Sequence, residues 1–485
     1  MSKYSEYKIV LVGLGPHAKR IYINLFKKYK INLELLVDLK SQKEKIKEYL
    51  NKNNFTSTEL FLIDDSYKDL TSLPNFIFVS LQNKIKSKNI KYAIISTEPK
   101  AHFMYAKFFL ENDINILLDK PITAPINCNN DINQARKIKE EYNELCELYE
   151  SKKNKINFMI QCQRRFHEGF IFVKNILKNI IQKYNIPITY IDIYHSDGMW
   201  VMPSEYLTRE NHPYKYGYGK LFHSGYHFID LLTWILELNN LTQNKKINNA
   251  EMFCSTFNPI DALNVINNND YINIFKTDKF EKTFENYEQN LKNYGELDFH
   301  SIINFKNNDK IITNCSLNLM QSGFSRRSWC DLPKDIYKGN GRVRHERLNI
   351  HVGPLLNIQI HSYQAYEISD KDKPLNNDIG SIEHFDIYIF RNVNIIGGKP
   401  FEKIDIANLS EKDKEYFCGY NEKARENCFI SFLNNSNQDS DLFKHKASIE
   451  LVSKAYEIMA TKSKILNFDI DIYIFIYTDI IQVFL

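Results

Sequence analysis

The chain has 485 residues, of which 43% are hydrophobic and 25% are charged, as expected for a globular protein with a sizeable core. Its 63 basic and 59 acidic side chains nearly cancel, which argues against nucleic acid or an anionic membrane surface as a partner. Eight cysteines without a CxxC pair fit neither a disulfide framework nor a zinc ribbon, and they predict free thiols in a reducing compartment.

Short apolar runs alternate with helical patterns along the first 120 residues. KIVLVGLG predicts a buried strand and AKRIYINLFKKY a helix, and they are followed by a strand, LELLVDL, and a helix over residues 41–50. The pattern continues with the strand NIKYAIIST, the helix KAHFMYAKFFLEN and the strand NILLDKP. This order predicts an α/β domain with a doubly wound parallel sheet over residues 1–158.

A glycine-rich turn links the first strand to the first helix in VGLGPHAKR. Gly13 allows the tight turn, and Gly15 lets the backbone approach a pyrophosphate. Ala18 is small enough for the helix to pack closely on the strand. Pro16 and His17 open the helix, whose free N–H groups favour a phosphate. The turn therefore predicts a dinucleotide-binding (Rossmann) site, although a similar turn can also occur where nothing binds.

An acid stands where such a site needs one. Asp38 ends the second strand, twenty residues after Ala18. There a carboxylate accepts hydrogen bonds from the ribose hydroxyls and repels a 2′-phosphate. We therefore predict NAD as the cofactor, with NADP not excluded because Lys40 lies near enough to soften the repulsion.

After Met159 the pattern becomes that of an α+β domain, which we assign to residues 159–485. Alternating segments between residues 296 and 408 predict a large open sheet, mixed or antiparallel: LDFHSIINF, KIITNCSLNLM, RLNIHV, LLNIQIHSY and HFDIYIFRNV. A later stretch, HKASIELVSKAYEIMATKS, predicts a helix. Residues 258–294 are rich in Asn, Lys and Asp with weak periodicity, which predicts an insertion or a long loop.

Both ends of the chain lack the pattern of an export or membrane segment. MSKYSEYKIVLVG is polar where a signal peptide needs an apolar run. Near the C-terminus, three aspartates between residues 469 and 479 interrupt the apolar residues, and a carboxylate at membrane depth costs about 2.5–3.5 kcal/mol. Alternation from Phe468 to Ile474 predicts a strand instead. We therefore expect a cytoplasmic protein with no membrane partner.

The segment KLFHSGYHFIDLL places His223, His227 and Asp230 on one face of a helix. Such a face fits a metal site, a catalytic acid–base pair or ordinary packing. An HExxH zinc site is excluded because residue 224 is serine, and no third ligand appears at a recognised spacing, so we predict no metal. The chain also has no GxxxxGK[ST] loop for an NTP and no GxSxG elbow of an esterase.

Three further segments line up in order with one family. ISTEPKAHFMYAKFFLENDINILLDKPIT, QRRF and GKLFHSGYHFIDLL resemble segments of the Gfo/Idh/MocA oxidoreductases, which include glucose–fructose oxidoreductase and inositol dehydrogenase. The resemblance covers about the first 235 residues. It implies an NAD(P)-dependent oxidoreductase that acts on a CH–OH group of a sugar, a cyclitol or a nucleotide-linked sugar. It also implies a homo-oligomer, a dimer or a tetramer, that pairs through the open sheet.

The resemblance implies roles for particular residues. Asp119 and Lys120 match the family's Glu-Lys-Pro signature, in which the lysine reaches both the nicotinamide and the substrate. Arg164 and Arg165 fall beside the site, where the chain enters the second domain. The loop after the fourth strand would line the cofactor through four residues: Thr97, Glu98, Pro99 and His102.

The family's Gly-Gly-x-x-x-Asp-x-Gly-x-His pattern is matched in part, by Gly219, Gly225 and His227. His223 stands at the aspartate position and Tyr218 at the first glycine. We expect His227 to move the hydroxyl proton and Lys120 to stabilise the alkoxide, with His223 relaying a proton or binding a hydroxyl. The missing aspartate leaves an alternative, a dinucleotide-binding regulatory or sensor protein without turnover.

Five basic residues form a further group: Arg326, Arg327, Arg342, Arg344 and His345. They fit either a contact with an anionic group of the substrate or a solvated basic face. The charge pattern favours the solvated face.

Overall fold

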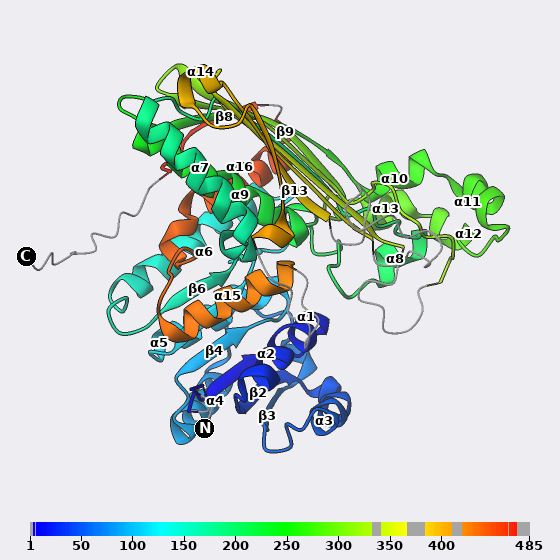
Figure 1. The fold of residues 1–485 in the computed structure, drawn as a ribbon. Coiled ribbons are helices and arrows are strands. Elements are labelled where there is room, and N and C mark those ends of the chain that lie inside the picture. The colour runs from blue at the N-terminus through cyan, green and yellow to red at the C-terminus, as the bar shows by residue number, and fades with distance from the viewer. Residues whose placement is uncertain are drawn as a thin grey trace, which may run out of the picture.

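The computed structural model describes residues 3–4, 6–331, 341–365, 384–409, 420–463 and 465–472. Two sheets dominate the molecule: a small one in the N-terminal domain, below in Figure 1, and a large one above it. In the described residues, no helix has both the length and the apolar character needed to cross a membrane.

The first sheet has six parallel strands in the order β3-β2-β1-β4-β5-β6. The strands are β1 (Ile9–Val12), β2 (Leu33–Leu39), β3 (Glu59–Ile63), β4 (Tyr92–Ile95), β5 (Asn115–Asp119) and β6 (Phe158–Gln161). All residues of β1 are buried, because helices cover both faces of the sheet. The predicted doubly wound sheet is confirmed, and the strand order reverses between β1 and β4, where such sheets bind ligands.

The helices of this half are α1 (Pro16–Arg20), α2 (Tyr22–Tyr29), α3 (Lys43–Lys52), α4 (Asn75–Lys88), α5 (His102–Glu111) and α6 (Ile132–Glu150). The predicted first helix is interrupted at Ile21, where α1 ends and α2 begins. Strand β6 extends to Gln161, so the first sheet continues three residues past the expected boundary at 158.

The second sheet is mixed, as predicted, and has nine strands in the order β14-β13-β12-β11-β7-β10-β9-β8-β15. They are β7 (Tyr190–Ser196), β8 (Asn249–Phe257), β9 (Asp298–Asn307), β10 (Lys310–Met320), β11 (Val343–Val352), β12 (Leu356–Ala365), β13 (His384–Arg391), β14 (Phe401–Asp405) and β15 (Ile465–Asp469). Only β7 and β10 pair in parallel among these described strands. The strand predicted from Phe468 starts three residues earlier and ends at Asp469, while Ile474 lies outside the described residues.

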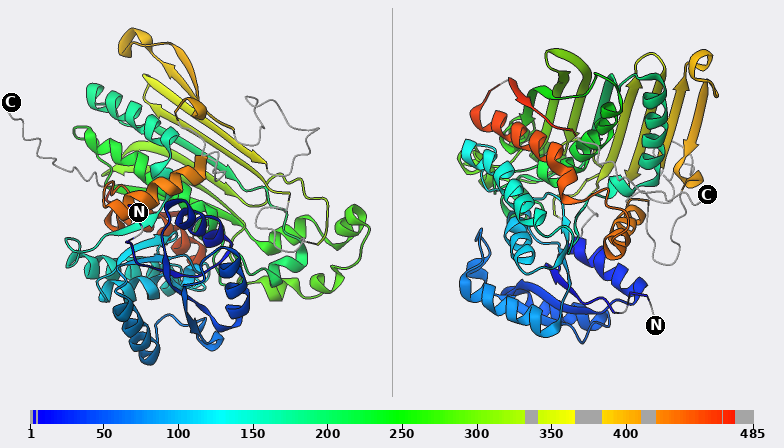
Figure 2. Two further views of the ribbon diagram at one scale, coloured as in Figure 1. Left: turned by 60° about the horizontal axis from the view of Figure 1, so that its bottom comes forward. Right: turned by 90° about the vertical axis from the view of Figure 1, so that its left-hand side faces the viewer.

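The remaining helices are α7 (Glu168–Tyr184), α8 (Pro203–Thr208), α9 (Tyr226–Leu236), α10 (Pro259–Val265), α11 (Asn268–Phe275), α12 (Glu281–Phe284), α13 (Tyr287–Leu291), α14 (Val393–Ile396), α15 (Tyr420–Asn434) and α16 (Lys446–Thr461). Helix α16 confirms the predicted late helix. Helices α7, α9 and α16 contact the large sheet, and Figure 2 shows α7 lying across one face of it. Phe253, Ile302 and Ile465, neighbours across β8, β9 and β15, are exposed.

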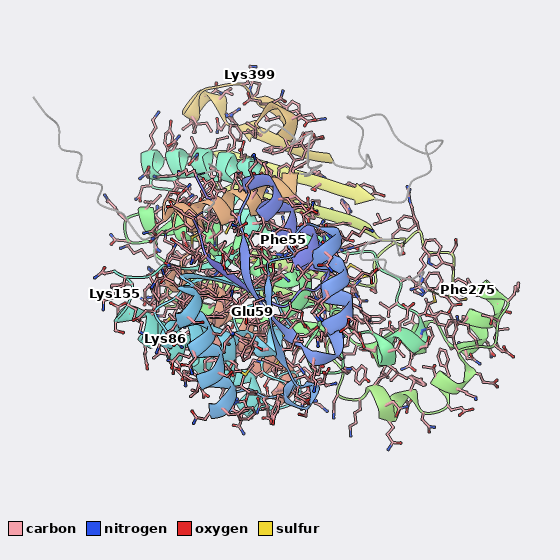
Figure 3. The ribbon with its side chains drawn as sticks, turned by 90° about the horizontal axis from the view of Figure 1, so that it is seen from below. Phe55, Glu59, Lys86, Lys155, Phe275 and Lys399 are labelled. Atoms are coloured by element: carbon pink, nitrogen blue, oxygen red, sulfur yellow. The ribbon has the colours of Figure 1, made fainter. Side chains whose placement is uncertain are left out.

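Residues 258–294 form a helical lobe, α10 to α13, between strands β8 and β9, which pair directly with each other. The lobe projects sideways in Figures 1 and 3, with Phe275 near its outer end. Its apolar residues, among them the buried Tyr271 and Phe280, form one cluster with residues of the segment 200–214. The expected long loop is wrong, because these residues form four helices, while the expected insertion stays a prediction. The helices are too short for a clear period, and the signal in the sequence was their Asn–Asp capping boxes at 258/261 and 267/270.

A buried ion pair ties α9 to the segment before α16. Arg165 binds Asp230 through two hydrogen bonds, Nε to Oδ2 at 2.9 Å and Nη2 to Oδ1 at 2.7 Å, and both side chains are fully buried. The Arg165 guanidinium also donates to the carbonyl of Asp439, and His445 Nδ1 lies 2.9 Å from Asp230 Oδ1. Burial by itself raises the pKa of the Asp230 carboxyl, but the charge of Arg165 outweighs it and holds the pKa well below its usual range.

Replacing Asp230 with alanine is expected to lower the free energy of unfolding by about 3–5 kcal/mol, because the Arg165 charge stays buried without its counter-ion. Urea-induced unfolding measures the change. The matched control is Asp192→Ala, which removes a contact of 3.5 Å with the half-exposed Arg347 and should cost less than about 1 kcal/mol. Equal losses in the two variants would contradict this account of the buried pair.

Candidate active site

A cavity of about 780 Å³ lies between the carboxyl ends of the first sheet and the second domain. It extends from the glycine turn to the two histidines. Fourteen predicted site residues line it: Gly13, Gly15, Pro16, His17, Asp38, Thr97, Glu98, Pro99, His102, Asp119, Lys120, Arg164, His223 and His227. Ala18 is completely buried and packs in the core beside the turn, as its predicted role in helix–strand packing requires.

The glycine turn has the shape that a dinucleotide needs. Gly13 has a φ of +86°, and a Cβ there would lie 2.6 Å from the carbonyl oxygen of Ser96. A Cβ on Gly15 would meet no atom within 4 Å, so the backbone there is open to the cavity. No side chain caps the start of α1. These residues therefore fit the pyrophosphate of a bound dinucleotide.

Asp38 is held at the end of β2 by backbone N–H groups. Its Oδ2 accepts a hydrogen bond from Leu14 N at 2.9 Å and its Oδ1 from Leu39 N at 2.7 Å. A second cavity, of about 300 Å³, adjoins Asp38 and provides room for the adenosine half. Lys40 instead forms an exposed pair with Asp64 at 3.8 Å, so its charge is engaged away from the carboxylate of Asp38.

The loop after β4 is fixed by a buried histidine. The two ring nitrogens of His102 lie 2.6 Å from the carbonyl oxygen of Pro121 and 3.1 Å from that of Thr97. Burial lowers the pKa of His102 to about 4, so the ring is neutral and donates to one carbonyl at a time. Burial raises the pKa of Glu98 to about 7, and its buried Oε2 has no hydrogen-bond partner within the described part of the chain.

Asp119 and Lys120, at the end of β5, make different contacts. Asp119 accepts hydrogen bonds from Tyr22 OH at 2.5 Å and from Ser96 Oγ at 2.6 Å, which braces the strand ends around the turn. Lys120 reaches across the cavity and donates from Nζ to the backbone carbonyl of His223. Burial lowers the pKa of Lys120 to about 8.

The segment with the two histidines begins with a π-helical turn, Leu221–Gly225, that runs into α9. Gly225 N donates to the carbonyl of Lys220 at 2.8 Å, and a Cβ on Gly225 would lie 2.6 Å from that oxygen. Such turns are frequent at functional sites. Nε2 of His223 and Nδ1 of His227 are buried, and neither has a hydrogen-bond partner among the described residues. Burial lowers the pKa of both rings, which are therefore neutral.

Asp230 does not take part in this site, although it shares the helix. Cys162, Asp230 and His445 come within 4.8 Å of one another, a spacing that a metal could use. Arg165, however, occupies both carboxylate oxygens of Asp230, and its positive charge opposes a cation there.

The sequence interpretation missed several residues of the cavity. Asp197, just after β7, accepts a hydrogen bond from Lys220 Nζ at 2.8 Å and another from Ser224 Oγ. The ring of His212 lies 4.8 Å from that of His223. Trp200 also lines the cavity, and its Nε1 donates to Tyr271 OH of the lobe at 3.1 Å. Nothing in the local sequence marked these residues, because their contacts depend on segments far apart in the chain.

Three of the five basic residues do not lie on a solvated face. Arg327, Arg342 and Arg344 line the cavity. Arg327 is buried and binds Glu205 through both carboxylate oxygens at 2.6 and 2.7 Å, while Arg342 donates to Asp197. The signal for this arrangement was the alternation of residues 342, 344 and 346 at the start of β11, which places their side chains on one face.

Comparison with known proteins identifies the first domain. Residues 7–151 match the Gfo/Idh/MocA family model, described as "Oxidoreductase family, NAD-binding Rossmann fold". Its first domain is thus similar to the NAD-binding domains of the Gfo/Idh/MocA oxidoreductases. The resemblance seen in the sequence is thereby confirmed, together with NAD as the cofactor. Among curated proteins, none matches this chain.

Solved structures match nearly the whole of this chain at low identity. Levoglucosan dehydrogenase in complex with NADH and L-sorbose has a TM-score of 0.57 at 12% identity, covering 96% of this chain and 99% of that chain. Aldose-aldose oxidoreductase from Caulobacter crescentus, complexed with glycerol, has 0.54 at 12%, covering 95% and 99%. An oxidoreductase from Agrobacterium radiobacter in complex with NAD+, L-tartaric acid and magnesium has 0.54 at 11%, covering 95% and 98%. These likenesses show a shared fold through both domains.

Lys120 and Lys174 make a matched pair for testing the site. Burial lowers the pKa of both amines to about 8, but Lys120 lines the cavity while Lys174 pairs with Glu237 at 3.2 Å. At pH 8 about half of each amine is unprotonated, so acetic anhydride should acetylate both. We expect saturating NADH to slow acetylation of Lys120 and to leave Lys174 unchanged, as followed by peptide mass spectrometry. Equal rates of Lys120 acetylation with and without NADH would show that Lys120 does not lie in the cofactor site.

Proposed function

We propose that this protein transfers a hydride between the nicotinamide of NAD and a carbinol or carbonyl carbon of a sugar, cyclitol or nucleotide-sugar-like substrate. One observation carries the proposal: Lys120, His223 and His227 come from two domains and line the same cavity as the glycine turn. His227 as a base and Lys120 as a cation favour an enzyme over a regulatory protein that only binds the dinucleotide.

On this proposal, the substrate hydroxyl lies between Lys120 and His227. The neutral imidazole of His227 accepts the hydroxyl proton, since its pKa is lowered by burial and its buried Nδ1 has no partner within the described residues. The ammonium of Lys120 stabilises the negative charge that develops on the oxygen. His223, with His212 beside it, carries the proton away or holds a second hydroxyl. The bound nicotinamide supplies only the acceptor or donor of the hydride.

Replacing Lys120 with alanine is expected to lower kcat by about 10²- to 10³-fold, because a single preorganised donor at a developing oxyanion contributes that much. The measurement is NADH formation across a panel of sugars and cyclitols, with NADH binding by fluorescence alongside. Lys107→Ala is the control, since Lys107 forms an exposed pair with Glu144. Full activity of Lys120→Ala contradicts the proposed roles, and tight NADH binding without turnover of any polyol by the wild type would favour the regulatory alternative.

Asp38 sets the preference for NAD on this proposal. Asp38→Asn keeps the side-chain shape but removes the charge that repels a 2′-phosphate, so NADPH should bind about tenfold more tightly relative to NADH. Fluorescence titration with the two reduced cofactors measures the ratio. The control is Asp113→Asn, because Asp113 forms an exposed pair with Lys152 at 2.5 Å and lines neither cavity. A ratio unchanged by Asp38→Asn would show that another group sets the preference.

A homo-oligomer formed through the large sheet is part of the proposal. The exposed fractions of Phe253, Ile302 and Ile465 are 41%, 57% and 55%, on three neighbouring strands. Such an apolar patch on an open sheet favours a second copy of the sheet as its cover. The seven described cysteines are free thiols, which supports a cytoplasmic location.

Ile302→Lys should convert the oligomer to a monomer in light scattering, since it buries a charge in the shared face. Ile274→Lys is the matched control, because Ile274 has a similar exposed fraction, 53%, but lies on the helical lobe. The same mass for wild type and Ile302→Lys would exclude this face as the interface.

A further inference from the structure

Helix α15 belongs to the second half of the chain but packs on the first domain. The ring of Phe429 lies 6.4 Å from that of Tyr22 and 6.1 Å from that of Phe26. On the outer side, Glu426 pairs with Lys28 at 2.6 Å and accepts a hydrogen bond from Tyr29. Figures 1 and 2 both show α15 beside the first helices of the N-terminal domain. The helix is therefore a fixed part of the wall next to the glycine turn.

One residue of α15, Arg425, lines the cavity together with the glycine turn and the catalytic end. Its backbone carbonyl accepts a hydrogen bond from Gln161 Nε2 at 3.2 Å, which fixes the helix against the end of β6. Its side chain is 10% exposed. The charge of Arg425 adds to burial in lowering the pKa of His17, next to the turn, and also that of Lys120. The guanidinium of Arg425 therefore borders the same cavity as the glycine turn and Lys120.

Glu422, one turn earlier in α15, links this arginine to the first helix. Its Oε1 lies 2.5 Å from Arg20 Nη1 and 3.4 Å from Arg425 Nη1. Because Arg20 ends α1, the helix that follows the glycine turn, the carboxylate holds the position of Arg425 relative to that turn. A side chain held in this way loses little conformational freedom on binding an anion.

We propose that Arg425 binds the pyrophosphate of the dinucleotide, so that α15 completes the cofactor site of the first domain. This inference rests on the binding of NAD that the proposed function requires. The positive charge of Arg425 favours contact with the pyrophosphate over contact with the other parts of the cofactor. The pyrophosphate carries two negative charges that a guanidinium can bind through paired hydrogen bonds, whereas oxidised nicotinamide is a cation that Arg425 repels.

The test compares Arg425→Gln with the wild type in fluorescence titrations of NADH and in competition by ADP-ribose and by AMP. We expect Arg425→Gln to weaken NADH and ADP-ribose by a common factor of about 10 to 100, because both contain the pyrophosphate. AMP lacks the pyrophosphate and should lose much less. Arg425→Lys keeps the positive charge but not the paired N–H donors of the guanidinium. It should give an intermediate loss of affinity for NADH and ADP-ribose.

The control variant is Lys423→Gln, on the same helix, where Lys423 pairs with Glu426 at 3.3 Å and is not among the cavity residues. It should bind all three ligands as the wild type does. Melting of the cofactor-free proteins separates a lost contact from a damaged fold. If Arg425→Gln does not fold, Arg425→Lys decides by the same ligand comparison.

Two results would overturn the inference: unchanged affinity of Arg425→Gln for NADH, or a loss for NADH that ADP-ribose does not share. Wild-type protein that binds neither NADH nor ADP-ribose would instead remove the proposed function itself. The failure of the inference and the failure of the function are therefore told apart by the wild-type titration.

Discussion

The hydrogen bond from Lys120 to the backbone carbonyl of His223 is the contact on which the site depends, because it joins the end of β5 to the π-helical turn before α9. A carbonyl, unlike a side chain, cannot be lost by substitution at residue 223. It persists only while the turn keeps its shape, and Gly225 is required for that shape. The geometry at this end of the cavity is thus held by the backbone, so a change of the side chain at residue 223 need not release Lys120.

The cavity contains several ionisable groups whose burial lowers the stability of the fold. Burial shifts the pKa of each of these groups. Lys120 is partly deprotonated near pH 8, and Glu98 titrates near pH 7. Three histidines are neutral: His102, His223 and His227. Among them, Glu98, His223 and His227 each have a buried atom without a hydrogen-bond partner in the described residues. Such atoms destabilise a fold, and they persist where a ligand completes them. The cost is offset elsewhere by fully paired clusters, such as Arg165 with Asp230, which lie outside the cavity. The paired charges that stabilise the fold therefore lie outside the cavity, apart from the ionisable groups that line it.

Local patterns were enough to predict the parallel sheet, the glycine turn with Asp38 and the hairpins of the second sheet, because each depends on neighbours in the sequence. They also placed Lys120 and His227 in one site, through the order of the family's motifs. They failed where the contact partner is distant. Asp197 meets Lys220, Arg342 reaches the same carboxylate, and Arg425 returns from the end of the chain to the first domain. The helices of the lobe were missed because all four are too short for a clear period, and only α10 and α11 begin with a capping box.

The lobe of residues 258–294 starts and ends on two strands that are already paired with each other, so the sheet does not need it. Its apolar residues share one cluster with the segment 200–214, and Tyr271 accepts a hydrogen bond from Trp200, which lines the cavity. A module inserted in this way can lengthen, shorten or repack over evolutionary time while the hydride chemistry, built on other segments, stays intact. The shape of the substrate chamber and the reaction performed in it are then inherited separately, and new specificities can arise without rebuilding the catalyst.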